Sequence, residues 1–171
     1  MKKTISILLM CLFVGISAQA QTKFTKFVNY FQEAKMPSTI SSKDVMISFM
    51  DKPLAWEFAL QKSSYTKEND TFVVPMGYYK ISENVGVFLT ATTVADTQDA
   101  TYGVSIQTFQ LKTSKLIDEF RVMAGTFSDF LGMRCEVEIS NKGNLVISTI
   151  GGSSTTKTSF NVSSKGKLKE L

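Results

Sequence analysis

Two carboxylates come closest to a catalytic pattern in this sequence. Glu136 and Glu138 lie two positions apart in the stretch LGMRCEVEI at 131–139. On a strand they share one face, with Cα atoms about 7 Å apart, and a glycosidase holds its two carboxylates roughly 5–10 Å apart. Any two alternating acids meet that spacing, and Arg134 adjoins them, so we favour a solvated strand face. A carboxylate-based glycan hydrolase is the alternative hypothesis.

Most other catalytic chemistry is excluded by composition. The chain contains no histidine, which removes Ser-His-Asp and Cys-His catalysis and histidine metal ligation. Cys135 alternates with apolar residues, so we interpret it as a buried, inert thiol and not as a nucleophile. The sequence also lacks an EF-hand loop, a dinucleotide-binding glycine motif and a Walker loop. We therefore assign no catalytic, cofactor-binding or metal-binding residue.

A few aromatic side chains offer a second, weaker pattern. Aromatic rings stack on sugars, but they also pack the faces of sheets. We interpret them as packing residues, with a sugar-stacking platform as the alternative. The residues concerned are Trp56, Tyr65, Tyr78 and Tyr79.

The first twenty residues have the form of a signal peptide. Lys2 and Lys3 precede an apolar run from Ile5 to Ile16, and Ala18-Gln19-Ala20 supplies the small-x-small cleavage pattern. The apolar run is too short to span a bilayer, which takes about 20 residues. We predict cleavage after Ala20, so that 1–20 is the signal peptide and 21–171 is a single exported domain. This domain is expected in the periplasm, at the cell surface or secreted, without a transmembrane segment.

Removal of this segment changes charge and cysteine content. The 19 basic residues fall to 17 when Lys2 and Lys3 leave, against 15 acidic ones, which predicts no nucleic-acid partner. Cys11 leaves too, so the mature chain cannot close an intramolecular disulfide. Lipidation of Cys11 is disfavoured because Met10 stands where a small residue should precede a lipidated cysteine.

Residues 21–61 are expected to form a helical preface of two or three short helices. In the first, from Thr22 to Lys35, the stripe of Phe24, Phe27, Val28 and Phe31 has helical spacing, and Pro37 ends it. The second is expected from Ser42 to Met50 and the third from Leu54 to Gln61. A polar loop at 62–70 follows.

From residue 71 onward the patterns indicate strands. Pro75 cannot donate to a ladder, so the strand from Phe72 to Ile81 is expected at an edge or with a bulge. The apolar parity changes between Ile106 and Phe109, which predicts a bulge or a strong bend near Thr108. The region 131–150 has the alternation of a half-buried hairpin, with Cys135 facing inward and a positive φ angle at Gly143.

These patterns predict a mainly β protein, or α+β by a strict count. Seven or eight antiparallel strands form a meander that must curl or split into two layers, as a sandwich or a barrel-like sheet. The helices are expected to cover one face or one open end. Three turns, at 111–120, 140–149 and 163–171, share similar chemistry without a constant repeat length.

Several short motifs resemble those of small exported proteins common in Bacteroidetes. These are the AQAQ cleavage region, the spacing of Phe24, Phe27 and Phe31, the LIDEF segment at 116–120 and the terminal KGKLKEL. The function of such proteins is largely unknown, so the resemblance implies an envelope location and a fold type and transfers no site residues. Many of these proteins are lipoproteins, from which this chain departs.

The function we expect is that of an exported, non-enzymatic binding or interaction domain. It would bind an envelope protein or a glycan through a sheet face or a loop end. The alternatives are the glycan hydrolase and a subunit of an envelope assembly. The sequence leaves the ligand and the oligomeric state open.

Overall fold

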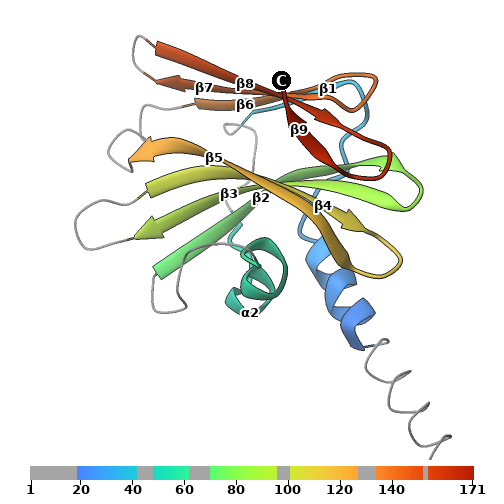
Figure 1. The fold of residues 1–171 in the computed structure, drawn as a ribbon. Coiled ribbons are helices and arrows are strands. Elements are labelled where there is room, and N and C mark those ends of the chain that lie inside the picture. Colours follow the sequence, from blue (N-terminus) through green and yellow to red (C-terminus); the bar gives the residue numbers. More distant parts are fainter. Residues whose placement is uncertain (1–18, 42–47, 62–69, 96–100, 127–133, 152–153) are drawn as a thin grey trace, which may run out of the picture.

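A computed structural model describes residues 19–41, 48–61, 70–95, 101–126, 134–151 and 154–171. Within these residues the fold consists of two stacked antiparallel sheets with a layer of helices beneath one of them (Figure 1). Of the predicted signal peptide, Gln19 and Ala20 are described and begin a helix at residues 19–28. Residues 1–18, Tyr65, Leu131 and Met133, with the predictions that concern them, lie outside the described residues.

The four-stranded sheet is a meander of long strands. It contains β2 (Asp70–Ser82), β3 (Val85–Ala95), β4 (Thr101–Gln110) and β5 (Lys115–Thr126), paired in that order. β2 is an edge strand, and its pairing with β3 shifts register between Pro75 and Gly77. Both expectations for the strand with Pro75 are therefore confirmed, because a residue without an N–H is tolerated at an edge or a bulge.

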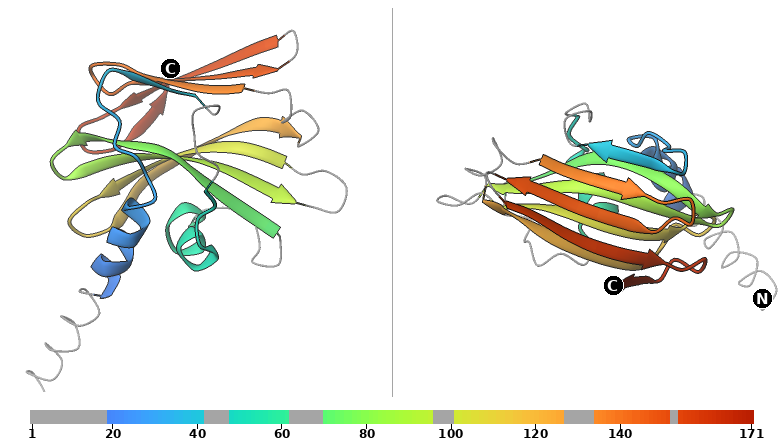
Figure 2. Two further views of the ribbon diagram at one scale, coloured as in Figure 1. Left: turned by 180° about the vertical axis from the view of Figure 1, so that it is seen from behind. Right: turned by 90° about the horizontal axis from the view of Figure 1, so that it is seen from above.

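The five-stranded sheet contains one strand from the N-terminal part of the chain. Its order is β1 (Ser38–Ser41), β6 (Arg134–Ile139), β7 (Leu145–Gly151), β8 (Ser154–Val162) and β9 (Leu168–Glu170). The view from above shows β1 at the same side of the sandwich as β2 (Figure 2). Two edges of different sheets are thus neighbours.

The core between the sheets is apolar and fully enclosed. Leu89 and Ile106 from the four-stranded sheet meet Val137, Ile147 and Phe160 from the five-stranded sheet, all with at most 1% exposure. Cys135, Val137 and Ile139 point into this core, as the alternation predicted.

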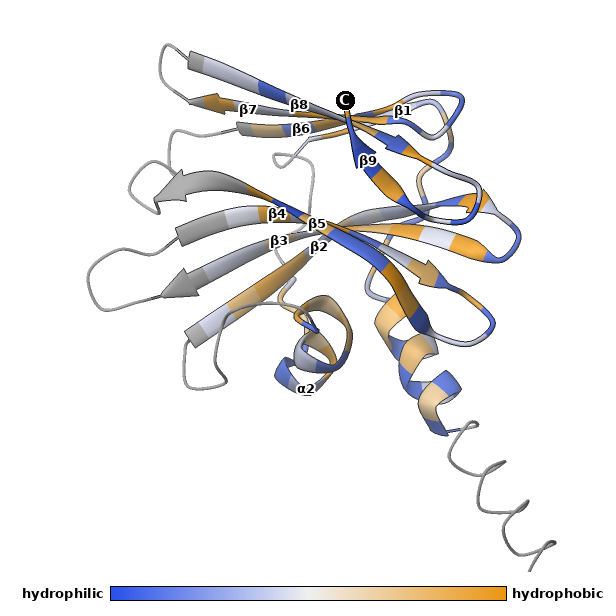
Figure 3. Cartoon of the chain, viewed as in Figure 1, coloured by the Kyte–Doolittle hydropathy of each residue, from blue (hydrophilic) through white to orange (hydrophobic). Residues whose placement is uncertain are grey.

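The helical layer covers the other face of the four-stranded sheet. It consists of a helix at residues 19–28, the short helix α2 (Lys52–Leu54) and the π-helical segment η1 (Ala55–Ala59). Phe27 is fully buried there, with its ring centroid 5.1 Å from that of Phe58 and 5.3 Å from that of Phe88. Burying one such ring contributes about 1.5–3 kcal/mol. Figure 3 shows apolar residues on this helix and on the sheet.

The structure corrects the predicted fold in three places. The described residues hold nine strands in two separate sheets, not seven or eight, and they do not close a barrel. The first helix ends at residue 28, because the chain beyond it pairs with β2 at Tyr78. The predicted connection after Pro37 contains β1, which pairs with β6.

The other two predicted helices differ in form. Of the expected helix from Ser42 to Met50, residues 42–47 lie outside the described part. Residues 48–50 are not helical, and the N–H of Met50 donates to the carbonyl of Val73. The third is present as α2 and η1, where the N–H of Leu60 reaches back five residues to the carbonyl of Ala55.

The parity change in β4 has a cause other than the predicted bulge. A register shift does occur beside Thr108, but the extra residue is Ile117 on β5, and β4 pairs regularly with β3. Ile106 faces the core between the sheets, whereas Phe109 faces the helical layer. The four-stranded sheet is the middle layer, so apolar residues occupy both of its faces.

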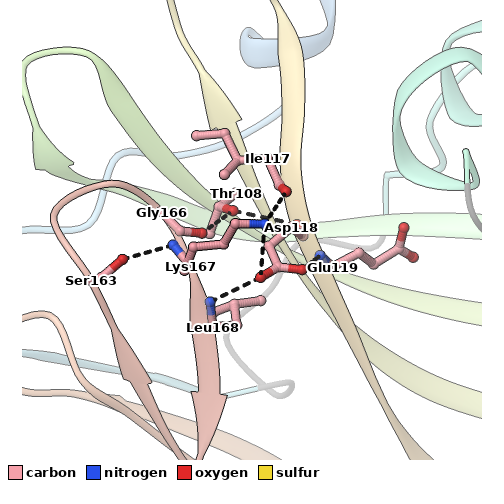
Figure 4. Close-up of polar contacts among 8 residues, drawn as sticks. All are labelled: Thr108, Ile117, Asp118, Glu119, Ser163, Gly166, Lys167 and Leu168. Carbon is pink, nitrogen blue, oxygen red and sulfur yellow. Dashed lines mark hydrogen bonds and ion pairs between the residues drawn. The ribbon is translucent and has the colours of Figure 1, made fainter.

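The turn before β9 is fastened to the four-stranded sheet by polar contacts (Figure 4). The hydroxyl of Thr108 donates to the carbonyl of Gly166 at 2.6 Å, and the N–H of Leu168 donates to the carboxylate of Asp118 at 3.2 Å. The Lys167 ammonium lies 3.8 Å from Asp118 and 3.3 Å from the carbonyl of Ile117. These contacts therefore join the five-stranded sheet to the four-stranded sheet next to β5.

Candidate functional site

The predicted carboxylate pair does not flank a shared cleft. Glu136 and Glu138 both point outward from β6, opposite the buried side chains. Glu138 is exposed and lines a shallow depression of about 470 Å³ together with Thr39 and Val146. Glu136 is half-buried, paired in register with Ser41 and Ser148, and does not line that depression. Among the described residues, the two acids therefore do not line this depression together.

The thiol of Cys135 has the environment of a packing residue. It is 2% exposed and faces the core between the sheets. Burial, with a smaller contribution from the Glu136 charge, raises the pKa of Cys135 to about 12. The thiol is protonated at neutral pH and therefore a poor nucleophile.

The candidate aromatic residues do not form one platform. Tyr79 points into the core between the sheets, whereas Tyr78 points to the helical layer and stacks on Phe88 at an interplanar angle of 10°. Trp56 lies in η1, half-buried against the aromatic cluster. The described residues Trp56, Tyr78 and Tyr79 therefore lie where packing residues lie, as the favoured interpretation predicted.

A cleft opens where the edges of the two sheets meet. It has a volume of about 630 Å³ and lies between β1 and the middle of β2. Its walls come from three neighbouring stretches and one further serine. The lining residues are Tyr30, Gln32 to Lys35, Ser38 to Ser41, Ser48, and Pro75 to Gly77.

The cleft lies along a stretch of the β2 edge that has no backbone partner among the described residues, between two positions where other segments bond to β2. At Tyr78, the carbonyl accepts from Ala34 N–H at 2.7 Å and the N–H donates to the carbonyl of Gln32 at 3.0 Å. At Val73, the carbonyl accepts from Met50 N–H at 2.9 Å. Between them lies Pro75, which has no N–H to offer. The opening coincides with this stretch.

Gly77 sets the distance between the two sheets at the cleft. A Cβ atom on this residue would lie 2.8 Å from Cδ1 of Ile40, closer than side-chain carbons tolerate. The missing side chain lets Ile40 of β1 pack directly on β2. The floor of the cleft is thus an apolar contact between the two edge strands.

A fixed carboxylate stands at the cleft. Glu33 accepts a hydrogen bond from the Tyr78 hydroxyl at 2.8 Å and pairs with the Lys80 ammonium at 3.2 Å. The bond from Tyr78, then that from Lys80, lowers the pKa of Glu33. Burial, then the bond to Glu33, raises the pKa of Tyr78 to about 12. At neutral pH the carboxylate is ionised and positioned.

The β1 wall was missed by the sequence predictions. Its segment, STIS, is only four residues long, and its β-branched Thr39 and Ile40 are the one local sign of a strand. The hydroxyl oxygen of Ser38 is buried in this wall without a hydrogen-bond partner. β1 also pairs on one side only, because no other described strand lies beside it. The wall therefore has polar groups to offer to a ligand.

In the part of the chain that the structure describes, no three histidine, cysteine, aspartate or glutamate side chains gather into a metal site. No described helix is both long and apolar enough to cross a membrane.

Comparisons of the chain with protein-family models, with curated proteins and with solved structures find no match.

Proposed function

We propose that the protein is a non-enzymatic binding domain of the bacterial envelope, exported through a cleaved signal peptide, which holds an extended polypeptide segment in the cleft between β1 and β2. The observation that carries this proposal is a cleft of about 630 Å³ bordered by the edges of both sheets. That volume is in the range of sites that bind ligands, about 300–1,000 Å³.

The edge of β1 from Ser38 to Ile40, where no described strand pairs opposite β6, supports a polypeptide as the ligand. A strand that is paired on one side presents N–H and C=O groups on the other, and an extended peptide satisfies them by adding a strand. The same surroundings already do this to β2, where the residues around Glu33 form a parallel bridge with Tyr78. Alternate side chains of the segment would meet the apolar Ile40 and Met76 or the hydroxyls of Thr39 and Ser48.

The two alternative functions receive less support. A hydrolase acting through two carboxylates needs both at one cleft, and Glu33 is the one acid among the described residues that line this cleft. An assembly subunit that buries a large apolar surface would expose one when isolated. Four large apolar side chains are exposed in the described residues, and of these Phe49 and Phe72 are in ring contact. A subunit could also join an assembly by taking a strand of its partner into the cleft. That case is already included in the proposed function.

Peptide selection with a cleft-filling variant tests the binding proposal. A displayed library of random dodecapeptides is selected on the protein, and the affinity of the selected peptides is measured by fluorescence polarisation. Ser48→Trp should abolish binding, because an indole at this exposed residue occupies the cleft. Ser164→Trp, an exposed serine in the turn before β9, is the control. Selected peptides that bind Ser48→Trp and the natural protein equally would rule out the cleft.

Export is tested separately by mass. The full chain is expressed in a Gram-negative host and the periplasmic fraction is analysed by intact-mass spectrometry. We expect the mass of a chain that begins at Gln21. A protein that stays in the cytoplasm with Met1 or Lys2 at its start would contradict the export proposal and leave the cleft proposal standing.

A further inference from the structure

The helix-covered face of the four-stranded sheet carries buried polar side chains beside its aromatic cluster. Thr90 and Thr92 of β3 and Ser105 and Gln107 of β4 form a polar patch, defined by these four residues, on the face that also bears Phe88. All four are completely buried. In register, Thr90 pairs with Ser105 and Phe88 with Gln107, so the patch is continuous across two strands.

Three oxygen atoms of the polar patch have no partner. They are the hydroxyl oxygens of Thr90 and Thr92 and the Oε1 atom of Gln107. Buried polar groups in proteins nearly always find a partner, because one left without a hydrogen bond costs about 1–3 kcal/mol. Several such groups together in a packed layer call for an explanation, and a bound molecule that supplies their missing hydrogen bonds is one. The hydroxyl of Thr71 on β2 is in the same condition.

The remaining groups of the patch are already engaged. The amide nitrogen of Gln107 donates to the carbonyls of Phe58 at 3.0 Å and Ala59 at 3.2 Å, which holds the end of η1 over the patch. On β5, Arg121 donates to the Ser105 hydroxyl at 3.1 Å and pairs with Glu119 at 3.4 Å. The patch is thus covered by η1. Beside it on β5, the charges of Arg121 and Glu119 neutralise each other.

The unpaired oxygen atoms of the patch determine which chemical groups a ligand must carry. Gln107 Oε1 only accepts hydrogen bonds, so the ligand must donate to it, whereas threonine hydroxyls both donate and accept. A carboxylate or a phosphate dianion has no donor for Gln107 Oε1, and the guanidinium of Arg121 already faces Glu119. Hydroxyl groups on an uncharged molecule meet every requirement, because each hydroxyl can both donate and accept a hydrogen bond.

We propose that the polar patch beneath η1 is a second binding site, which takes a small, uncharged polyhydroxylated molecule such as a monosaccharide. The ligand donates to Gln107 Oε1, exchanges hydrogen bonds with Thr90 and Thr92, and displaces or reorients η1 as it enters. This site lies on the opposite face of the four-stranded sheet from the core and is independent of the cleft at β1.

Trp56 provides the readout, because it is the only tryptophan in the chain and lies in η1. The protein is titrated with glucose, galactose, N-acetylglucosamine and myo-inositol, and with sodium acetate and sodium phosphate, while tryptophan emission and melting temperature are followed. We expect at least one of the neutral compounds to change the emission saturably and to raise the melting temperature. The two anions should do neither.

The matched variant is Thr90→Val with Thr92→Val, which keeps shape and removes both hydroxyls. We expect its affinity for the active compound to fall roughly tenfold or more, the equivalent of one good hydrogen bond, while its melting temperature without ligand rises. Thr156→Val, at an exposed threonine of β8, should change neither quantity. The proposal is overturned if no neutral compound saturates the emission, if acetate or phosphate acts equally, or if the double variant keeps full affinity.

Discussion

The phenolic hydroxyl of Tyr79 on β2 donates a buried hydrogen bond of 2.8 Å to the carbonyl oxygen of Gly143, in the turn between β6 and β7. The same relationship recurs between Thr108 on β4 and Gly166, in the turn between β8 and β9. In each case a hydroxyl of the four-stranded sheet holds a glycine carbonyl of the five-stranded sheet. The two sheets are therefore joined by polar contacts as well as by their apolar core.

The two turns share sequence and geometry. Each begins with a serine, has lysine two residues later and then a glycine, with φ angles of 76° at Gly143 and 80° at Gly166. Each serine hydroxyl accepts from the N–H four residues on, at 3.0 Å for Ser140 and 2.9 Å for Ser163. Of the three turns whose sequences resemble one another, those at 140–149 and 163–171 are therefore equivalent docking turns. The turn at 111–120 differs, because its residue with a positive φ angle is Ser114, at 59°.

Replacing Tyr79 with phenylalanine should cost about 1–3 kcal/mol of unfolding free energy, because the carbonyl of Gly143 loses its donor in a buried site. Urea denaturation of both proteins measures the difference. Tyr30→Phe is the control: its hydroxyl accepts a long, exposed bond of 3.4 Å from Asp51 N–H, and we expect a change within about 0.5 kcal/mol. Equal effects of the two variants would show that the bond to Gly143 contributes no stability.

Replacing Gly166 with alanine should destabilise the fold by more than about 1 kcal/mol, since a left-handed conformation alone costs a residue with a Cβ atom about 1–2 kcal/mol. The new methyl group would also lie 2.8 Å from Cδ1 of Ile117 and 3.0 Å from Cγ1 of Val85. Thermal unfolding measures the loss. Ser164→Ala, at an exposed position of the same turn, should leave the melting temperature nearly unchanged; a similar drop there would contradict this explanation.

Replacing Cys135 with serine should lower stability by about 1–3 kcal/mol, because it places a hydroxyl in the apolar core. Cys135 is 2% exposed among Val137, Ile139 and Ile147. Glu138→Gln on the exposed face of the same strand should stay within about 0.5 kcal/mol. Guanidinium denaturation compares the two variants, and a neutral effect of Cys135→Ser would mean that the thiol does not face the core.

Stability should fall as the pH rises above about 9. The unfolded chain releases the Cys135 and Tyr78 protons near their ordinary pKa values of 9.0 and 10.0, whereas folding raises the pKa of each to about 12. Between those values the native state binds more protons, so the contribution present at neutral pH is lost as the pH rises. Urea midpoints across this range measure the slope. Tyr78→Phe should make the slope shallower, and an unchanged slope would contradict the shift at Tyr78.

Much of the β architecture could be predicted from local patterns. The alternation from Cys135 to Ile139 indicated which side of β6 is buried, and Gly143 has the predicted positive φ angle. The proline in β2 indicated an edge or a bulge, and both are present. These features depend on residues within a few positions of one another, so they are visible in a linear sequence.

The candidate sites could not be predicted in the same way. Ser38 forms a strand because Ile139, far along the chain, pairs with it, and the local sequence carries almost no sign of this partner. Thr90 and Thr92 alternate with Leu89 and Ala91 just as they would in a strand with one wet face. They are buried because η1 and the aromatic cluster cover that face.

The sequence by itself determined the strands of the half-buried hairpin, the turn residues and the absence of histidine chemistry. It also predicted the sides of the strands that face the core between the sheets. Only the tertiary structure decided that the four-stranded sheet is buried on both faces and that the edges of β1 and β2 meet at a cleft. The physical reason is that backbone conformation responds to neighbours in the chain, whereas the burial of a face or an edge depends on which distant element covers it.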